Sequence, residues 1–259
     1  MKRKNFIQHA AITTAALATG KLSFASPKSA IKKELYELRE YEIHFHGNQN
    51  ALHEYLEKAF IPALNKNGVK SVGVFRETGK TEPAKVYVLI AYPSFEDYLA
   101  INEKVKLDDE FKKNSATWDK MPAEVPVFNR YDTSLLIAFD GFTALKVPAR
   151  EPRIFEIRTY EGYNEDAVKR KIKMFNEEEF TIFNRTGLHP VFFGEAIAGP
   201  HLPCLTYMIT FKNMEEREKN WAAFSADADW KRVSADAQYA NTVSNIRRVF
   251  LEPMPYSQV

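Results

Sequence analysis

The chain of 259 residues has one cysteine and lacks the short motifs that identify several common enzyme classes. A single cysteine, Cys204, cannot form a disulfide within the chain, so no covalent cross-link supports the fold. Because Cys204 begins an apolar run, we expect it to be a small buried hydrophobic residue rather than a nucleophile. There is no glycine-rich phosphate loop, nucleophile elbow, paired-cysteine motif or zinc-protease helix. The corresponding chemistries are therefore not predicted.

Acidic residues are absent from the first 25 positions, which carry four basic side chains. Basic residues at 2–4 precede a mildly apolar run at 6–20 that is too short to span a membrane. Residues 23–25 have the small-x-small form of a processing site. The pattern predicts an export signal and a periplasmic mature protein. Residues 3–8 resemble the twin-arginine type of signal, with lysine where the second arginine is usual; the alternative is an N-terminus that is never cleaved.

Without that segment the chain has little net charge. It keeps 36 − 4 = 32 basic and 34 acidic side chains, a net charge of −2. A basic surface for nucleic acid or anionic lipid is therefore not predicted. The remaining composition, 45% apolar and 27% charged over the whole chain, is typical of a soluble globular protein.

The sequence repeats itself with an offset of 119 residues. Tyr36-Glu37-Leu38-Arg39-Glu40-Tyr41 corresponds to Phe155-Glu156-Ile157-Arg158-Thr159-Tyr160, since 156 − 37 = 119. The same offset relates Gly68 to Gly187, Asp108 to Asp227, and Phe111 to Trp230. The repeat is longer than the roughly 20–50 residues of solenoid arrays, so each copy should have its own core.

Each copy predicts the element order β, α, β, β, α, β, which is the ferredoxin-like arrangement. The expected organisation is an export signal, a tether, a first unit, a linker and a second unit, at 1–25, 26–34, 35–140, 141–152 and 153–259. A four-stranded antiparallel sheet with helices on one face leaves its other face bare, so the two sheets should cover each other. The predicted fold class is α+β, with two tandem units forming an intrachain pseudo-dimeric α/β barrel.

Two local signals mark the helices. Ser94, followed by an acid at Asp97, matches the pattern of a helix cap, and Asn213 lies 119 residues after it. Pro62 predicts a kink or a restart of the first long helix. The second copy has Thr181 at that position, which favours a straighter helix.

Glutamate, arginine and tyrosine alternate with apolar residues in the first strand of each copy. Successive side chains of a strand point to opposite faces of the sheet. If the apolar residues meet the helices, the polar residues of both copies face the space between the two sheets. These candidate ligand-binding residues are Glu37, Arg39, Tyr41, Glu156, Arg158 and Tyr160.

The polar residues support two hypotheses. In a ligand site, the guanidinium groups would hold a small polar or anionic molecule, the tyrosines would donate hydrogen bonds, and a desolvated glutamate could move a proton. In a structural lattice, the four charges would pair and only join the two halves. The same groups serve both hypotheses, so the sequence leaves them open and assigns no catalytic residue.

The histidines show no repeated metal site. His44 and His46 have a spacing that can chelate a metal, but the second copy has Tyr163 and Glu165 at these positions. We therefore expect a solvated strand end and no metal. Other polar residues expected at the surface are His189, His201 and the acidic run 177–179.

The Glu-Leu-Arg-x-Tyr strand, followed by Pro62, Gly68 and the 108–111 helix end, resembles the NIPSNAP family. The second copy is similar through 155–160 and the closing segment 251–257. The resemblance implies a dimeric α/β-barrel fold, in a superfamily that contains small monooxygenases, haem-handling proteins and isomerases. It implies no single reaction. Neither copy has the repeated histidine that haem would need, so no cofactor is expected.

We therefore predict an exported NIPSNAP-family protein that binds a small polar or anionic molecule between its two sheets. If it is an enzyme, the expected chemistry is cofactor-free isomerisation or monooxygenase-like oxygenation. The alternative is a non-catalytic structural or interaction module. Assembly into a homo-oligomer is compatible with either.

Overall fold

The structure is a computed structural model that describes residues 32–79, 82–124 and 126–259. These residues belong to one compact unit. The predicted export signal at 1–25 lies outside the described residues, as does most of the tether predicted at 26–34.

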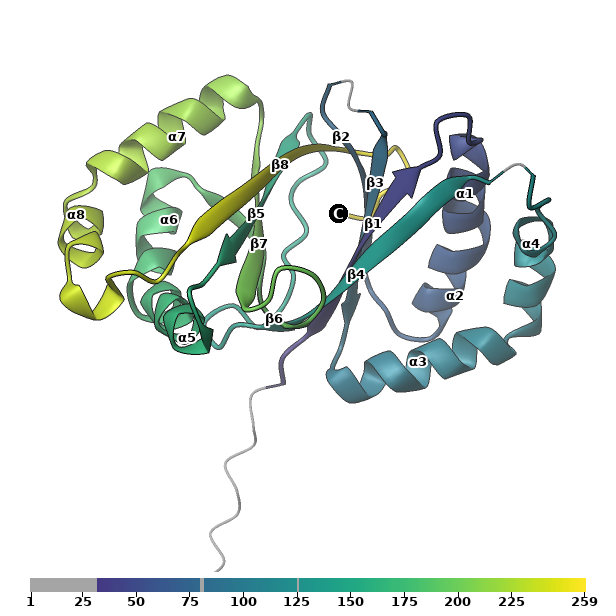
Figure 1. The fold of residues 1–259 in the computed structure, drawn as a ribbon, viewed down its shortest axis with the longest axis horizontal. Coiled ribbons are helices and arrows are strands. Elements are labelled where there is room, and N and C mark those ends of the chain that lie inside the picture. Colours follow the sequence, from purple (N-terminus) through teal and green to yellow (C-terminus); the bar gives the residue numbers. More distant parts are fainter. Residues whose placement is uncertain (1–31, 80–81, 125) are drawn as a thin grey trace, which may run out of the picture. The chain divides into compact units, whose positions relative to one another are not determined.

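Two copies of one element order follow each other along the chain (Figure 1). The first copy consists of β1 (Leu35–Ile43), α1 (Gln49–Tyr55), the π-helical segment η1 (Leu56–Phe60), α2 (Ile61–Lys66), β2 (Val72–Glu77), β3 (Lys85–Tyr92), α3 (Phe95–Leu107), α4 (Asp109–Asp119) and β4 (Phe128–Ala138). The second consists of β5 (Ile154–Glu161), α5 (Glu165–Met174), the π-helical segment η2 (Phe175–Glu179), α6 (Phe180–Thr186), β6 (His189–Ala198), β7 (Cys204–Phe211), α7 (Met214–Ala226), α8 (Ala228–Ser234), the 3-10 turn η3 (Ala237–Tyr239) and β8 (Asn245–Pro253). The predicted βαββαβ order is confirmed in both.

The strands close into a barrel in the order β1-β3-β2-β8-β5-β7-β6-β4. Two antiparallel pairs join the halves. Phe75 of β2 lies opposite Pro253 of β8, and Leu136 of β4 lies opposite Ala196 of β6. The predicted α+β fold with an intrachain pseudo-dimeric barrel is therefore confirmed.

Matching caps begin corresponding helices in the two copies. The side chain of Ser94 accepts a hydrogen bond from the backbone N of Asp97, and Asn213 accepts one from the backbone N of Glu216. Each cap satisfies a donor that the first helical turn leaves free. The predicted caps of α3 and α7 are thus confirmed.

The helical segment after the first strand changes its winding at the same place in both copies. The π-helical segments η1 and η2 are separated by the repeat length, since 175 − 56 = 119 and 179 − 60 = 119. Pro62 lies at the start of α2, where its missing N–H is tolerated. Thr181 follows the same change of winding in the second copy, so the prediction of a straighter helix there is wrong. The π-helical segment belongs to the repeated fold and does not depend on proline.

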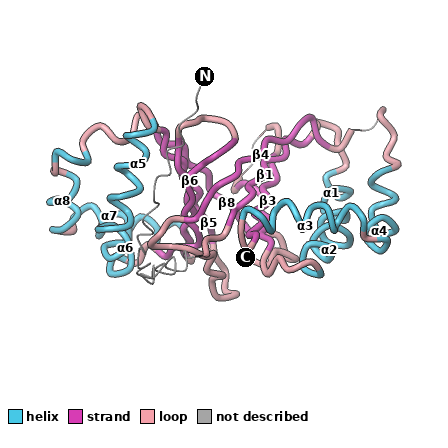
Figure 2. The backbone as a smooth tube through the Cα atoms, turned by 90° about the horizontal axis from the view of Figure 1, so that it is seen from below, coloured by secondary structure: helices cyan, strands magenta, loops and turns pink. Residues whose placement is uncertain are grey.

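The helices of each half lie outside the barrel, against the strands of that half (Figure 2). Each face of the sheet therefore has a buried part, although four residues of β4 and four of β8 are exposed. The barrel interior holds an apolar cluster that includes Tyr36, Phe75, Leu89, Leu136, Phe155, Ile157, Phe192, Met208 and Leu251. Two further cores lie between sheet and helices, around Leu56 and Val88 in the first half and Phe175 and Tyr207 in the second.

The face predicted for the two polar strips is wrong. Tyr36 and Ile157 lie in the barrel interior, so Glu37 and Arg158, which alternate with them, point toward the helices. The interior of an eight-stranded barrel is just wide enough for side chains to fill, and here apolar side chains fill much of it. The six candidate residues therefore lie in two separate layers rather than together between the sheets.

Candidate functional site

Glu156 is the centre of the polar strip in the second half. Its side chain is fully buried. Its carboxylate accepts hydrogen bonds from Nε of Arg217 at 2.8 Å and from Nε1 of Trp221 at 3.0 Å. Arg158 donates from Nη1 at 3.3 Å. Because Arg217 and Trp221 belong to α7, this cluster attaches that helix to β5.

Arg158 carries a buried guanidinium group with an unused donor. The residue is 8% exposed, and its Nε atom is buried without a hydrogen-bond partner among the described residues. Its guanidinium carbon lies 4.3 Å from the centroid of the Trp221 ring. Burial opposes the charged form, but Tyr207, Tyr160 and Glu156 raise the pKa of the guanidinium above its usual value. The group is thus a fixed cation with capacity for another acceptor.

A pocket of about 400 Å³ lies beside this guanidinium, between the sheet and the helices of the second half. Its charged lining residues are Arg158, Lys171 and Glu179. Hydroxyl-bearing residues also line it, namely Tyr160, Ser225, Ser234, Tyr239 and Thr242, and its aromatic walls include Phe183, Trp221, Phe224 and Trp230. The walls are continuous, since the ring centroids of Phe224 and Trp230 lie 4.4 Å apart. We call this cavity the helix-covered pocket. Two of the predicted site residues, Arg158 and Tyr160, line it.

A second buried ion pair lines the helix-covered pocket. Lys171 of α5 and Glu179 of η2 are 5% and 2% exposed, and Nζ of Lys171 donates to Oε1 of Glu179. The ammonium group also lies 4.8 Å from the centroid of Phe175 and 5.4 Å from that of Trp230. Burial raises the pKa of Glu179 above its usual value, although Lys171 and Arg158 act in the opposite direction. This ion pair was not predicted from the sequence.

The acidic run at 177–179 was expected to be a solvated helix face, and this is wrong for its last member. Glu177 is exposed and Glu178 is partly exposed, but Glu179 is buried. The three residues belong to the π-helical segment η2, whose turn is wider than that of an α-helix. Counted at about 3.6 residues per turn, Glu179 lies on the same helix face as Val168 and Phe175, which are buried. Two signals could therefore have found it: this periodicity, and the repeat, because Phe60, an apolar residue, occupies the corresponding place.

Tyr160 presents a protonated phenol to the pocket. Its hydroxyl lies 2.9 Å from that of Tyr207. Burial raises the pKa of both phenols above the usual range. Both groups therefore stay protonated at neutral pH, and Tyr160 can donate or accept a hydrogen bond beside the cavity.

The first half builds a similar cluster without the second ion pair. Nε of Arg39 donates to Glu37 at 2.7 Å, and Tyr92 and Thr133 donate to the same carboxylate at 3.1 Å and 3.3 Å. Tyr41 lies at the end of this cluster, 3.4 Å from Nη1 of Arg39. Burial opposes the charge of Arg39, but Glu37 and Tyr41 raise its pKa above the usual value.

The two halves differ at the two positions that form the second ion pair. The repeat places Leu52 at the position of Lys171 and Phe60 at the position of Glu179, since 171 − 119 = 52 and 179 − 119 = 60. The Phe60 ring centroid lies 4.8 Å from the guanidinium carbon of Arg39. An aromatic side chain thus covers the guanidinium of the first half, whereas the guanidinium of the second half faces a cavity.

The two clusters do not join the halves to each other. The side-chain partners of Glu37 all belong to the first half, and those of Glu156 all belong to the second. Each cluster lies between the sheet and the helices of its own half. These residues therefore do not form the expected lattice between the halves. The halves are joined instead by strand pairing and by the apolar barrel interior.

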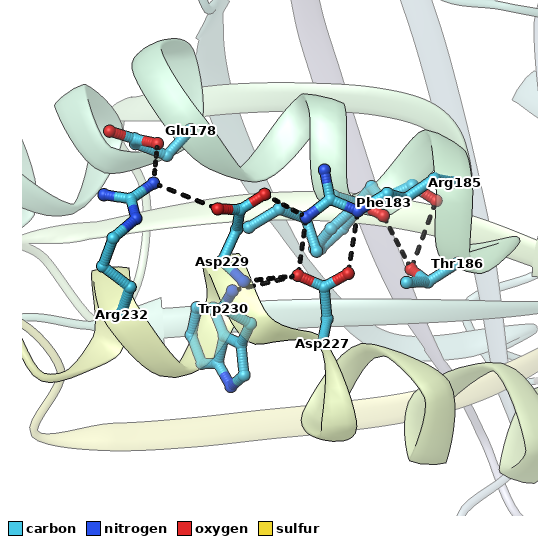
Figure 3. A network of polar contacts seen from close by, with 9 residues as sticks. Glu178, Phe183, Arg185, Thr186, Asp227, Asp229, Trp230 and Arg232 are labelled. Atoms are coloured by element: carbon cyan, nitrogen blue, oxygen red, sulfur yellow. Dashed lines mark hydrogen bonds and ion pairs between the residues drawn. The ribbon is translucent and has the colours of Figure 1, made fainter.

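A network of ion pairs holds α8 against the helices on which the pocket is built (Figure 3). Arg185 of α6 donates to Asp227 at 2.6 and 2.8 Å and to Asp229 at 2.7 Å. Asp227 also caps α8 by accepting from the backbone N of Trp230 at 3.1 Å. Arg232 donates to Glu178 of η2 at 3.0 Å. The network therefore fixes the segment that supplies the Trp230 wall.

The remaining candidates lie apart from this pocket. His44 is partly exposed and His46 is exposed. His189 is exposed at the start of β6, and Nδ1 of His201 lies 3.8 Å from Glu161. Across residues 32–79, 82–124 and 126–259, no group of three or more His, Cys, Asp and Glu side chains is arranged to hold a metal ion. Cys204 is 3% exposed, which confirms the prediction that it is buried.

None of the helices in the described part of the chain has the length and apolar character needed to cross a membrane.

Comparison with known proteins identifies a family for the second half. A model of the NIPSNAP family matches residues 155–258. The first half is related to this segment through the internal repeat. No curated protein sequence matches the chain.

Solved structures share the fold. A monooxygenase-like protein of Fusobacterium nucleatum has a TM-score of 0.54 at 12% identity, over 86% of this chain and 93% of that one. A monooxygenase-like protein of Lactobacillus acidophilus has a TM-score of 0.53 at 11% identity, over 86% and 94%. A NIPSNAP-like domain protein of Burkholderia xenovorans is 19% identical over 42% of this chain and 90% of its own, with a TM-score of 0.37. At these identities the first two comparisons establish the fold alone.

Proposed function

We propose a function for this chain, whose residues 155–258 match the NIPSNAP family model, from its own site: it binds a small planar monoanion in the helix-covered pocket of the second half. The observation that carries this proposal is the guanidinium-bearing side chain of Arg158, which lines the cavity and whose Nε atom is buried without a partner among the described residues. A buried polar group without a partner is costly, and a bound acceptor would remove that cost.

The charge of the pocket favours an anion. Arg158 and Lys171 contribute two positive charges and Glu179 contributes one negative charge, which leaves an excess of one positive charge. A guanidinium group matches the forked geometry of a carboxylate. Tyr160 adds a hydroxyl at the same wall. A ligand with one carboxylate or one enolate therefore balances the charge of the site.

The walls favour a flat apolar body on that anion. Trp221, Phe224 and Trp230 form one surface, with ring centroids 5.4 Å and 4.4 Å apart along the series. A volume of about 400 Å³ lies within the range of small-molecule sites. We therefore propose an aromatic or conjugated carboxylate as the ligand class.

Glu37, Arg39, Tyr41 and Glu156 have a different role in this proposal. The carboxylate of Glu156 is occupied by two arginines and an indole, and the guanidinium of Arg39 is covered by Phe60. We propose that these four residues hold the sheet to its surroundings and do not contact the ligand.

Titration with phenylacetate tests the binding proposal. Two of the three tryptophans in the chain, Trp221 and Trp230, line the pocket, so their fluorescence should change as the probe binds. The neutral analogue phenylacetamide should bind at least about 10-fold more weakly, because it lacks the charge that Arg158 pairs with. Arg158→Met should abolish the titration.

The repeat supplies the matched control. Arg39→Met removes the corresponding arginine of the first half and should leave the affinity for phenylacetate unchanged. Loss of binding in both variants to the same extent, or equal binding of the acid and the amide, would contradict the assignment of the site.

We also propose that the chain is exported and that the mature protein starts after Ala25. The support is the basic, acid-free N-terminal segment and its small-x-small end. N-terminal sequencing of the protein from the envelope fraction should begin after the predicted signal. A sequence that begins at Met1 would contradict this proposal.

A further inference from the structure

We infer that Glu179 is the catalytic base of the helix-covered pocket, an inference that rests on the proposed anion site. The pocket would enolise aromatic 2-oxo acids by moving a proton to and from the carbon next to the carbonyl. This assigns to the pocket an isomerase-type activity, with a substrate class that provides both the anion and an acidic C–H group.

Glu179 has the position that such a base needs. It is the only carboxylate among the residues that line the helix-covered pocket, and it is 2% exposed. Within the π-helical segment η2, Glu179 is buried whereas Glu177 is exposed. The other charged and phenolic residues that line the cavity are Arg158, Lys171, Tyr160 and Tyr239, and the hydroxyl of Tyr239 donates to Glu177.

The carboxylate of Glu179 also has capacity to accept a proton. Within the described residues, its side chain accepts a hydrogen bond from Lys171 alone. Glu156, by contrast, accepts from Arg158, Arg217 and Trp221 and does not line the pocket. Burial with a single partner leaves Glu179 basic, because desolvation raises its pKa.

The fold itself does not require this ion pair. The first half forms the same π-helical segment with Leu52 and Phe60 at the two positions. A buried ion pair is often no more stabilising than an apolar pair of similar volume, so the charges of Lys171 and Glu179 are better explained by chemistry than by stability.

The step balances without an oxidant, a metal or a cofactor. Glu179 takes a proton from C3 of the 2-oxo acid, the C–H electron pair forms the C2–C3 double bond, and the carbonyl electrons move to the oxygen. Arg158 and Tyr160 stabilise the enolate charge by hydrogen bonding. The protonated Glu179 then returns a proton to C3, and in D2O it returns a deuteron after exchange with solvent.

Deuterium uptake by phenylpyruvate measures this step. We expect the protein to accelerate the loss of the C3 proton signal in D2O, followed by NMR, above the buffer rate. Glu179→Gln should lower the protein-dependent rate by about 100-fold or more, while phenylacetate still binds. The matched control, Glu37→Gln, changes a buried glutamate of the first half and should leave the exchange rate unchanged.

A second variant keeps the test decisive if Glu179→Gln fails to fold. K171L/E179F places the natural pair of the first half in the second half and should fold, but it should show no protein-dependent exchange. Exchange at the buffer rate in the unmodified protein, or unchanged exchange in Glu179→Gln, would overturn the catalytic inference while phenylacetate binding upholds the site. Failure of both phenylacetate and phenylpyruvate to bind would overturn the proposed function as well.

Discussion

At the scale of residues, Arg39 and Arg158 show how one repeated side chain can have two environments. Both are buried beside a glutamate two positions earlier in the strand. Arg39 stacks against Phe60, whereas Arg158 stacks against Trp221 and keeps a donor without a partner among the described residues. The difference arises from residues on the helices, which the strand motif itself does not reveal.

His53 provides a pH-dependent contact at the same scale. Its Nδ1 atom lies 2.6 Å from the hydroxyl of Tyr256, in the segment that follows β8 and pairs with β2. Burial lowers the pKa of His53, although the nearby Glu57 acts in the opposite direction. The unfolded chain, with an ordinary histidine pKa near about 6.5, therefore binds the proton more readily. The contribution of neutral His53 to the free energy of unfolding is therefore present above about pH 6.5 and is lost as the pH falls below that value.

We predict that His53→Gln destabilises the protein more at pH 7.5 than at pH 5.5. Urea unfolding of both proteins at the two pH values measures the difference. The titration of all other groups is common to both proteins and cancels in the comparison. An equal loss of stability at both pH values would contradict the assigned neutral state.

Residue alternation could predict which side chains form the polar strips, but not which way they face. Glu37 and Arg158 were correctly placed on one side of their strands with the tyrosines. Their direction depends on what lies on each side of the closed barrel, and alternation is symmetric between the two sides. Lys171 and Glu179 were missed because charged side chains on a helix are usually solvated, and their burial depends on the contact that they make with each other.

At the scale of elements, the helices of the second half are held together by ion pairs at their ends. Asp227 accepts two hydrogen bonds from Arg185 and also caps the first turn of α8. The first half repeats the arrangement with Lys66, whose Nζ lies 2.7 Å from Asp108 and 3.2 Å from Glu110. Arginine replaces lysine in the half that has the pocket, and its planar group can bind both oxygens of one carboxylate.

We predict that Asp227→Ala lowers the Tm more than Asp229→Ala does. Asp227 contributes both the cap and the two-bond contact with Arg185, whereas Asp229 accepts one bond from Arg185 and lies near Arg232. Arg185 lowers the pKa of Asp227 well below its usual range. The stabilisation by ionised Asp227 is therefore present at neutral pH and is lost as the pH falls below the ordinary pKa of an aspartate, so the Tm difference between the two variants should shrink there. Thermal unfolding followed by circular dichroism measures it. Equal Tm values for the two variants would show that this contact does not hold α8.

The sequence predicted where the helices begin, but not which of their turns are π-helical. Caps at Ser94 and Asn213 were found because capping depends on a few adjacent residues. The π-helical segments were missed, since Pro62 explains a break in only one copy. Both copies contain the π-helical segment although only the first has proline. This indicates that packing against the sheet, rather than proline, sets the π-helical winding.

At the scale of the whole molecule, the barrel interior makes the two halves depend on each other. Phe75 of the first half lies 4.9 Å, centroid to centroid, from Phe155 of the second. Leu136 and Met208 belong to the same buried cluster, so each half alone would expose this apolar surface. The division into units at 35–140 and 153–259 therefore stays a proposal about ancestry and local folding.

We predict that residues 32–140 and 153–259, expressed separately, do not persist as folded monomers. Each should self-associate, and mixing should yield a 1:1 complex, because β2 pairs with β8 and β4 pairs with β6. Size-exclusion chromatography with light scattering measures the masses. A folded, monomeric half that ignores its partner would contradict the shared core.

The fold could be predicted because the repeat fixed the element order, and because a bare sheet must be covered. The place of the candidate site could not, because closure of the barrel places buried side chains on both faces of strands such as β1 and β5. Which face holds a pocket then depends on long-range contacts such as those of Trp221 and Trp230. The sequence therefore predicted Arg158 and Tyr160 as site residues but placed them in the wrong layer.

The most direct test is a crystal structure of the protein grown with phenylacetate. We predict density for the probe in the second half, with its carboxylate within hydrogen-bond distance of Arg158 and its ring against Trp221 and Trp230. An occupied site between the two sheets, or an empty helix-covered pocket at saturating probe, would contradict the assignment of anion binding to this half.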